Sequence, residues 1–261
     1  MLKRIKQYLL NRAFDEQLSD SLKKDGVDFK KKDKQIIVYF PEKLILRKSP
    51  SSDFPVFLQV FHEKQYEPVV SFCRWNNIQV NTIVDLGANV GLTSIYLKKQ
   101  FGKAVIYAIE PDLLNFETLQ NNINEFTDIK AEQLAIWSHE TFLSPAYEEQ
   151  SDWGKTFHEN SNNHSHSIKA MSIRQFISHK QLNIIDILKI DIEGAEKHIF
   201  EGELDFLGQV KVIAIEIHET FIAKKTIQDI LLNKGFILQE AGELLIGINM
   251  LFLSQLHNEK V

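Results

Sequence analysis

The sequence is poor in cysteine, in long apolar runs and in positive charge, and each shortage excludes a class of protein. Cys73 is the single cysteine, so neither an intramolecular disulfide nor a cysteine-rich metal site can form. No continuous apolar run follows the interleaved basic and apolar residues of the first segment, which argues against export and membrane spanning. The net charge of -5 lacks the concentrated basic footprint that nucleic-acid phosphate requires. We therefore expect a cytoplasmic protein without stable membrane insertion and without a nucleic-acid partner.

The length of the chain suits one main α/β core with an extension. Of its 261 residues, 44% are hydrophobic and 25% are charged, as in ordinary globular proteins. We predict an N-terminal helical and hairpin extension over residues 1–76 and a main domain over residues 77–261. The extension should contain an amphipathic helix over residues 2–25, a hairpin over residues 35–47 and a helix from about Pro68.

The main domain alternates short apolar strands with amphipathic helices, which is typical of a mostly parallel sheet covered on both faces. The predicted strands cover residues 82–87, 104–110, 130–137, 186–191, 210–218, 235–240 and 248–253. Residues 241–247 are too few for the crossover that parallel neighbours need, so the last two strands should form an antiparallel hairpin. The sequence thus predicts a doubly wound, Rossmann-like α/β fold with a mostly parallel seven-stranded sheet that ends in this hairpin.

A glycine-rich loop follows the first strand of this sheet. Gly87 and Gly91 permit a sharp turn and a close approach of a ligand to the main chain. The loop departs from the dinucleotide pattern G-x-G-x-x-G, because Asn89 stands where the second glycine would be and Asp85 precedes the turn. A pyrophosphate would be repelled by Asp85, whereas a ligand with an ammonium and a sulfonium would not. We therefore assign Asp85, Gly87, Asn89 and Gly91 to binding of S-adenosyl-L-methionine.

The ends of the next two strands extend this binding site. Glu110 and Pro111 close the second strand, about 20 residues beyond the glycine loop, where nucleotide-binding folds place a ribose-binding carboxylate. The alternative is an acid that caps the following helix, a role that Asp112 can also fill. Ala135, near the end of the third strand, is expected beside the adenine, although it is equally ordinary as a core residue.

The fourth strand carries charge where apolar residues are expected. Alternation places Lys189 and Asp191 on one side of the strand, and a buried lysine needs a partner, for which we predict Glu216 of the fifth strand. That pair can be structural or catalytic. Asp191 ends its strand at the edge where open α/β sheets bind ligands. We assign catalysis to Asp191, to Glu193 and to His218, with Asp191 also near the cofactor; the alternative for His218 is a packed or exposed histidine.

These motifs resemble the FkbM family of S-adenosylmethionine-dependent methyltransferases, over roughly residues 80–255. The resemblance rests on Asp85-Leu86-Gly87-Ala88-Asn89-Val90-Gly91, on Glu110-Pro111 and on Leu188-Lys189-Ile190-Asp191-Ile192-Glu193-Gly194-Ala195-Glu196. It implies a class I methyltransferase fold and transfer of a methyl group to a hydroxyl of a sugar, glycan or natural product. The remaining alternatives are an NAD(P)-binding oxidoreductase and a non-catalytic methyltransferase-like binding protein.

The motifs do not determine the acceptor, the oligomeric state or the group that activates the acceptor. The acceptor is expected to be a small molecule or a glycan, and a homo-oligomer is neither indicated nor excluded. A side-chain base and a metal ion are both compatible with the acidic residues, and no metal ligand is assigned. His158, His164 and His166 lie in a polar stretch over residues 138–168, which we interpret as a solvated lid rather than a metal site.

Overall fold

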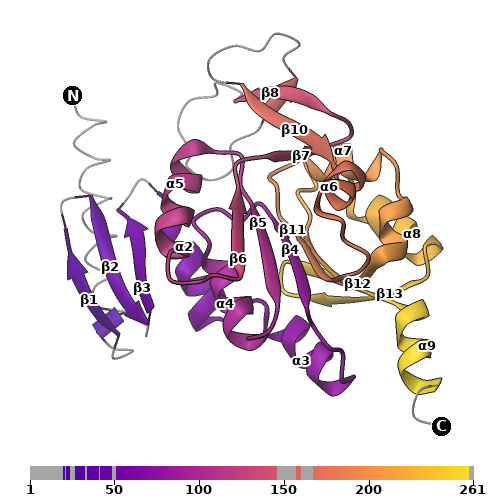
Figure 1. The fold of residues 1–261 in the computed structure, drawn as a ribbon, viewed down its shortest axis with the longest axis horizontal. Helices are drawn as coiled ribbons and strands as arrows, with labels where there is room; N and C mark the ends of the chain where they lie inside the picture. The colour runs from indigo at the N-terminus through magenta and orange to yellow at the C-terminus, as the bar shows by residue number, and fades with distance from the viewer. Residues whose placement is uncertain are drawn as a thin grey trace.

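The computed structural model describes residues 20, 22–23, 27–32, 34–40, 42–48, 51–145, 157–159 and 167–258. A seven-stranded sheet forms its centre (Figure 1). The strands follow one another across it in the order β13 (Phe236–Ala241), β14 (Leu244–Asn249), β12 (Val210–Glu216), β11 (Ile185–Ile190), β4 (Thr82–Leu86), β5 (Val105–Ile109) and β6 (Ile129–Glu132). β14 runs antiparallel to β13 and β12, and the remaining neighbours are parallel. The predicted fold class is confirmed.

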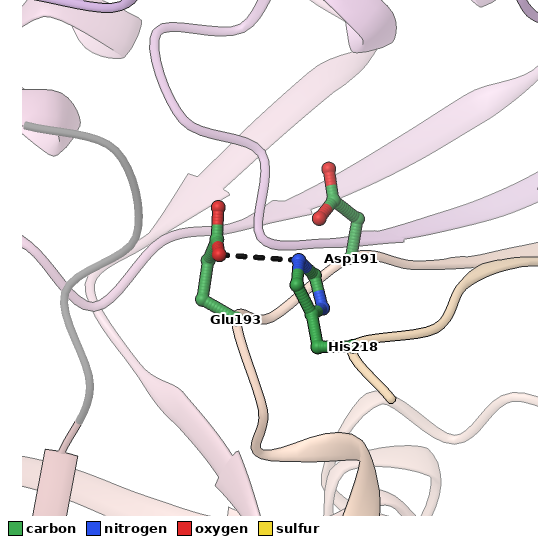
Figure 2. A group of neighbouring side chains, drawn as sticks. All are labelled: Asp191, Glu193 and His218. Atoms are coloured by element: carbon green, nitrogen blue, oxygen red, sulfur yellow. Dashed lines mark ion pairs between the residues drawn. The ribbon is translucent and has the colours of Figure 1, made fainter. Parts of the chain in front are cut away.

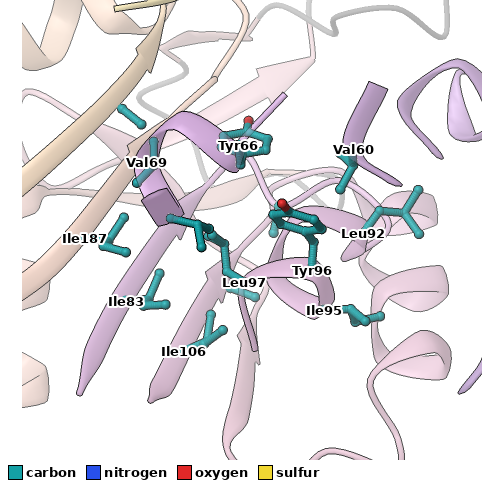
Figure 3. Packing of buried hydrophobic residues seen from close by; sticks show 14 of the residues in the cluster. Val60, Tyr66, Val69, Ile83, Leu92, Ile95, Tyr96, Leu97, Ile106 and Ile187 are labelled. Atoms are coloured by element: carbon teal, nitrogen blue, oxygen red, sulfur yellow. The ribbon is translucent and has the colours of Figure 1, made fainter. Parts of the chain in front are cut away.

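Alternate residues of the central strands point to opposite faces of the sheet, and a separate apolar cluster forms on each face. Ile83 and Ile187 belong to one cluster, and Figure 3 shows them beside Val69. Val84 and Leu188, the next residues along the same strands, belong to the other. The first cluster includes residues of α3 (Glu67–Trp75), α4 (Leu92–Gln100) and α5 (Leu113–Asn122), and the second those of α6 (Ile173–Lys180), α7 (Glu196–Phe200), η2 (Asp205–Gln209) and α8 (Lys224–Asn233).

The closing hairpin is tighter than the sequence analysis predicts. Only Gly242 and Glu243 join β13 to β14, and Gly242 has a φ of 61°, as a two-residue turn between strands requires. The prediction of a strand over residues 248–253 is therefore wrong, because β14 ends at Asn249 and α9 (Met250–Asn258) follows. The side-chain oxygen of Asn249 accepts a hydrogen bond from the backbone N–H of Leu251 at 3.1 Å, which favours the change from strand to helix.

The third predicted strand, over residues 130–137, is two strands in two sheets. β6 stays in the central sheet, whereas β7 (Ala135–Trp137) pairs in parallel with β10 (Ile168–Ser172). The small sheet has the order β7, β10, β8 (Thr141–Pro145) and β9 (Phe157–Glu159) and appears at the top of Figure 1. The polar stretch interpreted as a lid thus contains strands. His158 lies in β9, whereas His164 and His166 fall outside the described residues.

The extension forms a second small sheet. β2 (Gln35–Phe40) and β3 (Glu42–Arg47) confirm the predicted hairpin, and β1 (Asp28–Lys31) adds an antiparallel strand. The helix predicted over residues 2–25 lies almost entirely outside the described residues. Two short helices, α2 (Asp53–Phe57) and the π-helix η1 (Leu58–His62), lead to α3, which confirms the helix predicted from Pro68. One apolar cluster contains residues from both sides of position 76, so the boundary drawn there stays a prediction.

Across the described ranges, none of the helices is both long enough and apolar enough to cross a membrane.

Asn122 joins the extension to the main domain. Its side-chain oxygen accepts from the backbone N–H of Ile45 at 2.6 Å, and its side-chain nitrogen donates to the carbonyl oxygens of Ile45 at 3.1 Å and Val90 at 2.9 Å. The side chain is 2% exposed, so water cannot replace these partners. It holds β3 against α5 and against the loop that follows β4.

Replacing Asn122 by alanine should lower the free energy of unfolding by about 1–3 kcal/mol, because buried backbone groups lose their partners. Asn121→Ala is the matched control, since Asn121 is exposed on the same helix and donates only to the carbonyl of Glu117. Chemical denaturation of the two variants measures the difference. Equal losses would show that Asn122 does not join the two parts.

Candidate active site

A cavity of about 820 Å³ opens at the carboxyl ends of β4, β5 and β11. Its volume lies in the range of sites for small molecules and cofactors. The glycine loop, Glu110, Asp191 and Glu193 all line it. The extension also lines it, through Arg47 among others. This is the edge of an open α/β sheet at which ligands are expected to bind.

The glycine loop touches the end of the fourth strand. Gly87 has a φ of 76°, and a Cβ atom there would lie 1.7 Å from the carbonyl oxygen of Asp191, so only glycine fits. Asn89 also has a positive φ, of 50°. Gly91 starts α4, and a Cβ atom on it would lie 2.5 Å from Cδ1 of Leu119, so this glycine allows helix packing. Of the predicted loop residues, Gly87 and Asn89 line the cavity, whereas Gly91 and Asp85 do not.

Glu110 also lines the cavity, and the residue is only 4% exposed. Its two oxygens accept from the backbone N–H groups of Asn89 at 2.8 Å and of Asp112 at 2.9 Å. Burial raises the pKa of Glu110 to about 7, although these two hydrogen bonds oppose the rise. Asp112 caps α5 by accepting from the N–H of Asn115, so capping does not fall to Glu110. Pro111 lines the cavity beside Glu110.

Two further observations fit a nucleoside ligand. The side-chain oxygen of Asn89 is buried and has no hydrogen-bond partner within the described part of the chain, so it is available to a ligand donor. Ala135 in β7 also lines the cavity, next to the larger Trp137. The indole ring of Trp137 is stacked on the ring of His198 with centroids 3.5 Å apart, and its N–H donates to Glu159 at 2.6 Å. These contacts fix an aromatic surface near Ala135.

Lys189 connects the fourth strand to the glycine loop. Its Nζ atom lies 3.1 Å from Asp85 and donates to the carbonyl oxygens of Leu86 at 3.2 Å and Gly87 at 2.6 Å. The prediction that Glu216 is the partner of Lys189 is therefore wrong. Asp85 lies directly opposite Lys189 on the adjacent strand β4, whereas Ala214 is the residue opposite it on β12. Burial would lower the pKa of Lys189, but Asp85 and Asp191 outweigh burial and raise it above its ordinary value.

The three residues assigned to catalysis lie together. One ligand atom from each of Asp191, Glu193 and His218 falls within 4.8 Å of the others. Figure 2 shows the imidazole of His218 with Glu193 on one side and Asp191 on the other. Nε2 of His218 is 3.1 Å from Glu193, and Nδ1 is 2.9 Å from the buried Glu196.

The carboxylates of this cluster set the charge of the imidazole. Hydrogen bonds to Glu193 and Glu196 raise the pKa of His218 to about 11. An imidazole that carries this proton cannot accept another, so His218 acts as a base only if its contact with Glu193 changes. Desolvation raises the pKa of Asp191, Lys189 lowers it and Glu193 raises it again, with a net rise.

Two further titratable residues line the cavity: Glu216, which the sequence analysis named only as a partner for Lys189, and Tyr66, which it did not assign. Glu216 lines the cavity at the end of β12, where burial and Asp191 raise its pKa to about 7, and Gln65 donates to it at 3.4 Å. Tyr66 is 2% exposed and also lines the cavity. Its pKa is raised above the ordinary value, chiefly by burial. The position of Glu216 at the end of a strand indicates a cavity residue, whereas no local feature of the sequence distinguishes Tyr66.

The fold and the cavity define the class of the protein. A mostly parallel sheet with an antiparallel β14, a glycine loop after β4 and carboxylates at the ends of β5 and β11 form a Rossmann-like methyltransferase architecture. Residues 85–239 match the family described as Methyltransferase FkbM domain. The chain therefore belongs to the FkbM methyltransferase family, and it is similar to named methyltransferases.

Two fungal relatives carry that name. Methyltransferase 1 of Beauveria bassiana (strain ARSEF 2860) is 24% identical over 180 residues, which cover 59% of this chain and 71% of the relative. Methyltransferase sdnD of Sordaria araneosa is 26% identical over 188 residues, covering 59% and 73%. The solved magnesium protoporphyrin IX methyltransferase of Synechocystis PCC 6803 covers 74% of this chain and 82% of its own at 13% identity, with a TM-score of 0.42. That structural likeness is too distant to bear on function.

Lys189→Met should cost about 3–5 kcal/mol of unfolding free energy, because it leaves the carboxylate of Asp85 buried without its charge partner. Lys225→Met is the matched control: this lysine pairs with Asp229 on the surface, its side chain is 77% exposed, and its loss should cost less than about 1 kcal/mol.

Denaturant unfolding of both variants, together with Asp85→Asn and the Asp85→Asn/Lys189→Met double variant, measures the coupling. The double variant should lose less stability than the sum of the two single variants. Additive losses would show that the two side chains act independently.

Proposed function

We propose that this protein is an S-adenosylmethionine-dependent methyltransferase that methylates a hydroxyl oxygen of a sugar, a glycan or a natural product. The observation that carries the proposal is the shared cavity, which the glycine loop and Glu110 line together with Asp191 and Glu193. We assign the glycine loop and Glu110 to the nucleoside, and Asp191 and Glu193 to an acceptor that must lose a proton. The buried free thiol of Cys73 accords with action in a reducing cytoplasm.

The cofactor side follows from five residues. Gly87 leaves the main chain open to close approach, and Asn89 offers an unpaired side-chain oxygen. Glu110 offers carboxylate oxygens to the two ribose hydroxyls, while Pro111 and Ala135 supply apolar wall for the nucleoside. Asp85 supports this side indirectly, by holding Lys189 against the carbonyl groups of the loop.

The acceptor side has to hold a hydroxyl group and take its proton. When bound, S-adenosylmethionine supplies a methyl group whose bond to sulfur breaks, with the electron pair returning to sulfur, as a bond to the acceptor oxygen forms. Asp191 and Glu193 present carboxylate oxygens in the same cavity, where they can orient the hydroxyl. An aliphatic alcohol is a weak nucleophile, so the proton must leave to a base or the oxygen must be acidified.

The cavity is lined by both signs of charge: Lys34, Arg47 and Lys48 come from the extension, and carboxylates lie beside the glycine loop. Those carboxylates disfavour the oxidoreductase alternative, because a pyrophosphate bound at the loop would face Glu110 and Asp191. A sulfonium and an ammonium would be attracted by them. A non-catalytic binder would keep the cofactor side without needing the acceptor side.

Calorimetry with S-adenosylmethionine, S-adenosylhomocysteine and NAD separates these classes. We expect the first two to bind and NAD not to bind. Methyl-labelled cofactor is then incubated with host glycans and small-molecule extract, and label should appear as a mass increase of one CH₂ group on an oxygen. Asp191→Asn should abolish label transfer while cofactor binding survives. Binding of NAD instead, or binding with no transfer to any fraction, would refute the proposal.

The affinity for S-adenosylmethionine should depend on pH through Glu110, whose pKa is about 7. Above this pH the carboxylate is ionised and accepts from the ribose; below it the protonated group loses one acceptor, so affinity should fall by up to about tenfold per pH unit. Isothermal titration from about pH 5 to pH 8 measures this. Glu110→Gln is the matched control and should bind weakly with a flat profile. A flat profile in the unaltered protein would rule out the ribose role.

A further inference from the structure

Three side chains beside the cavity have the arrangement of metal ligands. Nε2 of His218 and an oxygen of Glu193 are 3.1 Å apart, and an oxygen of Asp191 completes a set within 4.8 Å. Ligand atoms that share one octahedral Mg²⁺ at about 2.1 Å lie about 3 Å from their neighbours, so the separation of His218 and Glu193 suits a shared ion, and Asp191 needs only a small movement of its side chain to join them. From this geometry we propose that Asp191, Glu193 and His218 bind a divalent cation of the Mg²⁺ or Mn²⁺ type.

The support of the imidazole strengthens this assignment. Nδ1 of His218 contacts Glu196 at 2.9 Å, and Glu196 is fully buried and also accepts from the backbone N–H of Ile192 at 3.2 Å. A histidine that donates from one ring nitrogen to a buried carboxylate presents the other nitrogen as a ligand, as in many metal sites. Here that other nitrogen, Nε2, faces Glu193 at 3.1 Å, and a bound cation would take the place of the proton that the two atoms share. The second oxygen of Glu196 has no hydrogen-bond partner among the described residues.

The local balance of charge also calls for a cation. Asp191, Glu193, Glu196 and Glu216 bring four carboxyl groups to this region, as the mutual electrostatic effects on Asp191 and Glu216 indicate. The cationic groups described there are Lys189, whose Nζ lies 3.1 Å from Asp85 and 3.6 Å from Asp191, and the imidazole of His218. The carboxyl groups outnumber them, and a divalent ion would offset the remaining negative charge.

The backbone places two of the three ligands, Asp191 and Glu193, on one short segment. Glu193 has a φ of 52°, unusual for a residue with a side chain, and Gly194 follows with a φ of 95°. A Cβ atom on Gly194 would lie 2.4 Å from the ring of Phe221, so this turn is held by packing. The turn directs Glu193 back to His218 across two strand ends (Figure 2).

The ligand types select the class of ion. Two carboxylates and one imidazole suit Mg²⁺, Mn²⁺ or a similar ion, and three protein ligands leave positions open for water or an acceptor oxygen. Asp191 and Glu193 line the cavity, so an open position would face the acceptor. There a cation would acidify the acceptor hydroxyl. This role rests on the proposed methyl transfer, whereas the site itself rests only on the geometry.

Manganese binding tests the site directly. Protein without a histidine tag is stripped with chelator and titrated with Mn²⁺, and free Mn²⁺ is followed by its electron paramagnetic resonance signal. We expect one bound ion per chain, with affinity reduced more than about tenfold in Glu193→Gln and in His218→Asn. The matched controls, Glu201→Gln and His179→Asn, alter exposed residues at the end of α7 and on α6 and should bind as the unaltered protein does.

Each outcome bears on the proposal separately from methyl transfer. Glu193 has a side chain that is 43% exposed, so its variant should fold, and unchanged circular dichroism and S-adenosylhomocysteine affinity check this. Absence of stoichiometric Mn²⁺ binding, or binding that survives both ligand variants, would overturn the cation site. Mn²⁺ binding without S-adenosylmethionine binding would leave the cation site standing and remove the proposed function.

Discussion

The buried contact between Lys189 and the glycine loop determines how the two halves of the cavity meet. Lys189 extends from β11 to Asp85 and to the carbonyl groups of Leu86 and Gly87, at the carboxyl end of the neighbouring β4. Gly87 completes the contact, because a side chain there would overlap the carbonyl of Asp191. The glycine loop and the end of β11 are therefore held in contact. A buried charge explains the motif better than apolar packing would, since the three N–H donors of a lysine can satisfy a carboxylate and two carbonyl groups together.

Much of the fold follows from the sequence because its signals are local. The period of the apolar residues and the alternation of strand and helix were enough for the doubly wound sheet, and the short link before β14 was enough for the hairpin. Element boundaries were less evident: the apolar residues continue on both sides of Gly247 and Asn249, up to Phe252, so the pattern does not show where the strand becomes a helix. Asn249 makes that change through hydrogen bonds. The split between β6 and β7 depends on pairing with β10, more than thirty residues later, which no local pattern contains.

The site residues also divide into those that local motifs indicate and those that depend on long-range packing. Gly87, Asn89, Glu110, Ala135, Asp191 and Glu193 were predicted from motifs at strand ends, and they line one cavity. The partner of Lys189 was not predictable in this way, because Asp85 and Glu216 both lie on strands next to β11 and only the register separates them. Tyr66 and Arg47 reach the cavity from the extension, so their place depends on how distant segments pack.

The charged residues of the run from Lys189 to Glu196 point to three different surroundings. Lys189 points back to the loop after β4, Asp191 and Glu193 face the cavity, and Glu196 lies beneath the imidazole of His218. Extended backbone separates the first two by one residue, and the left-handed turn at Glu193 and Gly194 reverses the direction before α7 begins. A sequence that reads as repeated acid and apolar residues thus places its charged side chains in three different surroundings, because its backbone changes conformation along the run. His218 reaches them from the segment that follows the adjacent strand β12, so the cluster depends on the parallel pairing of β11 with β12 as much as on the motif itself.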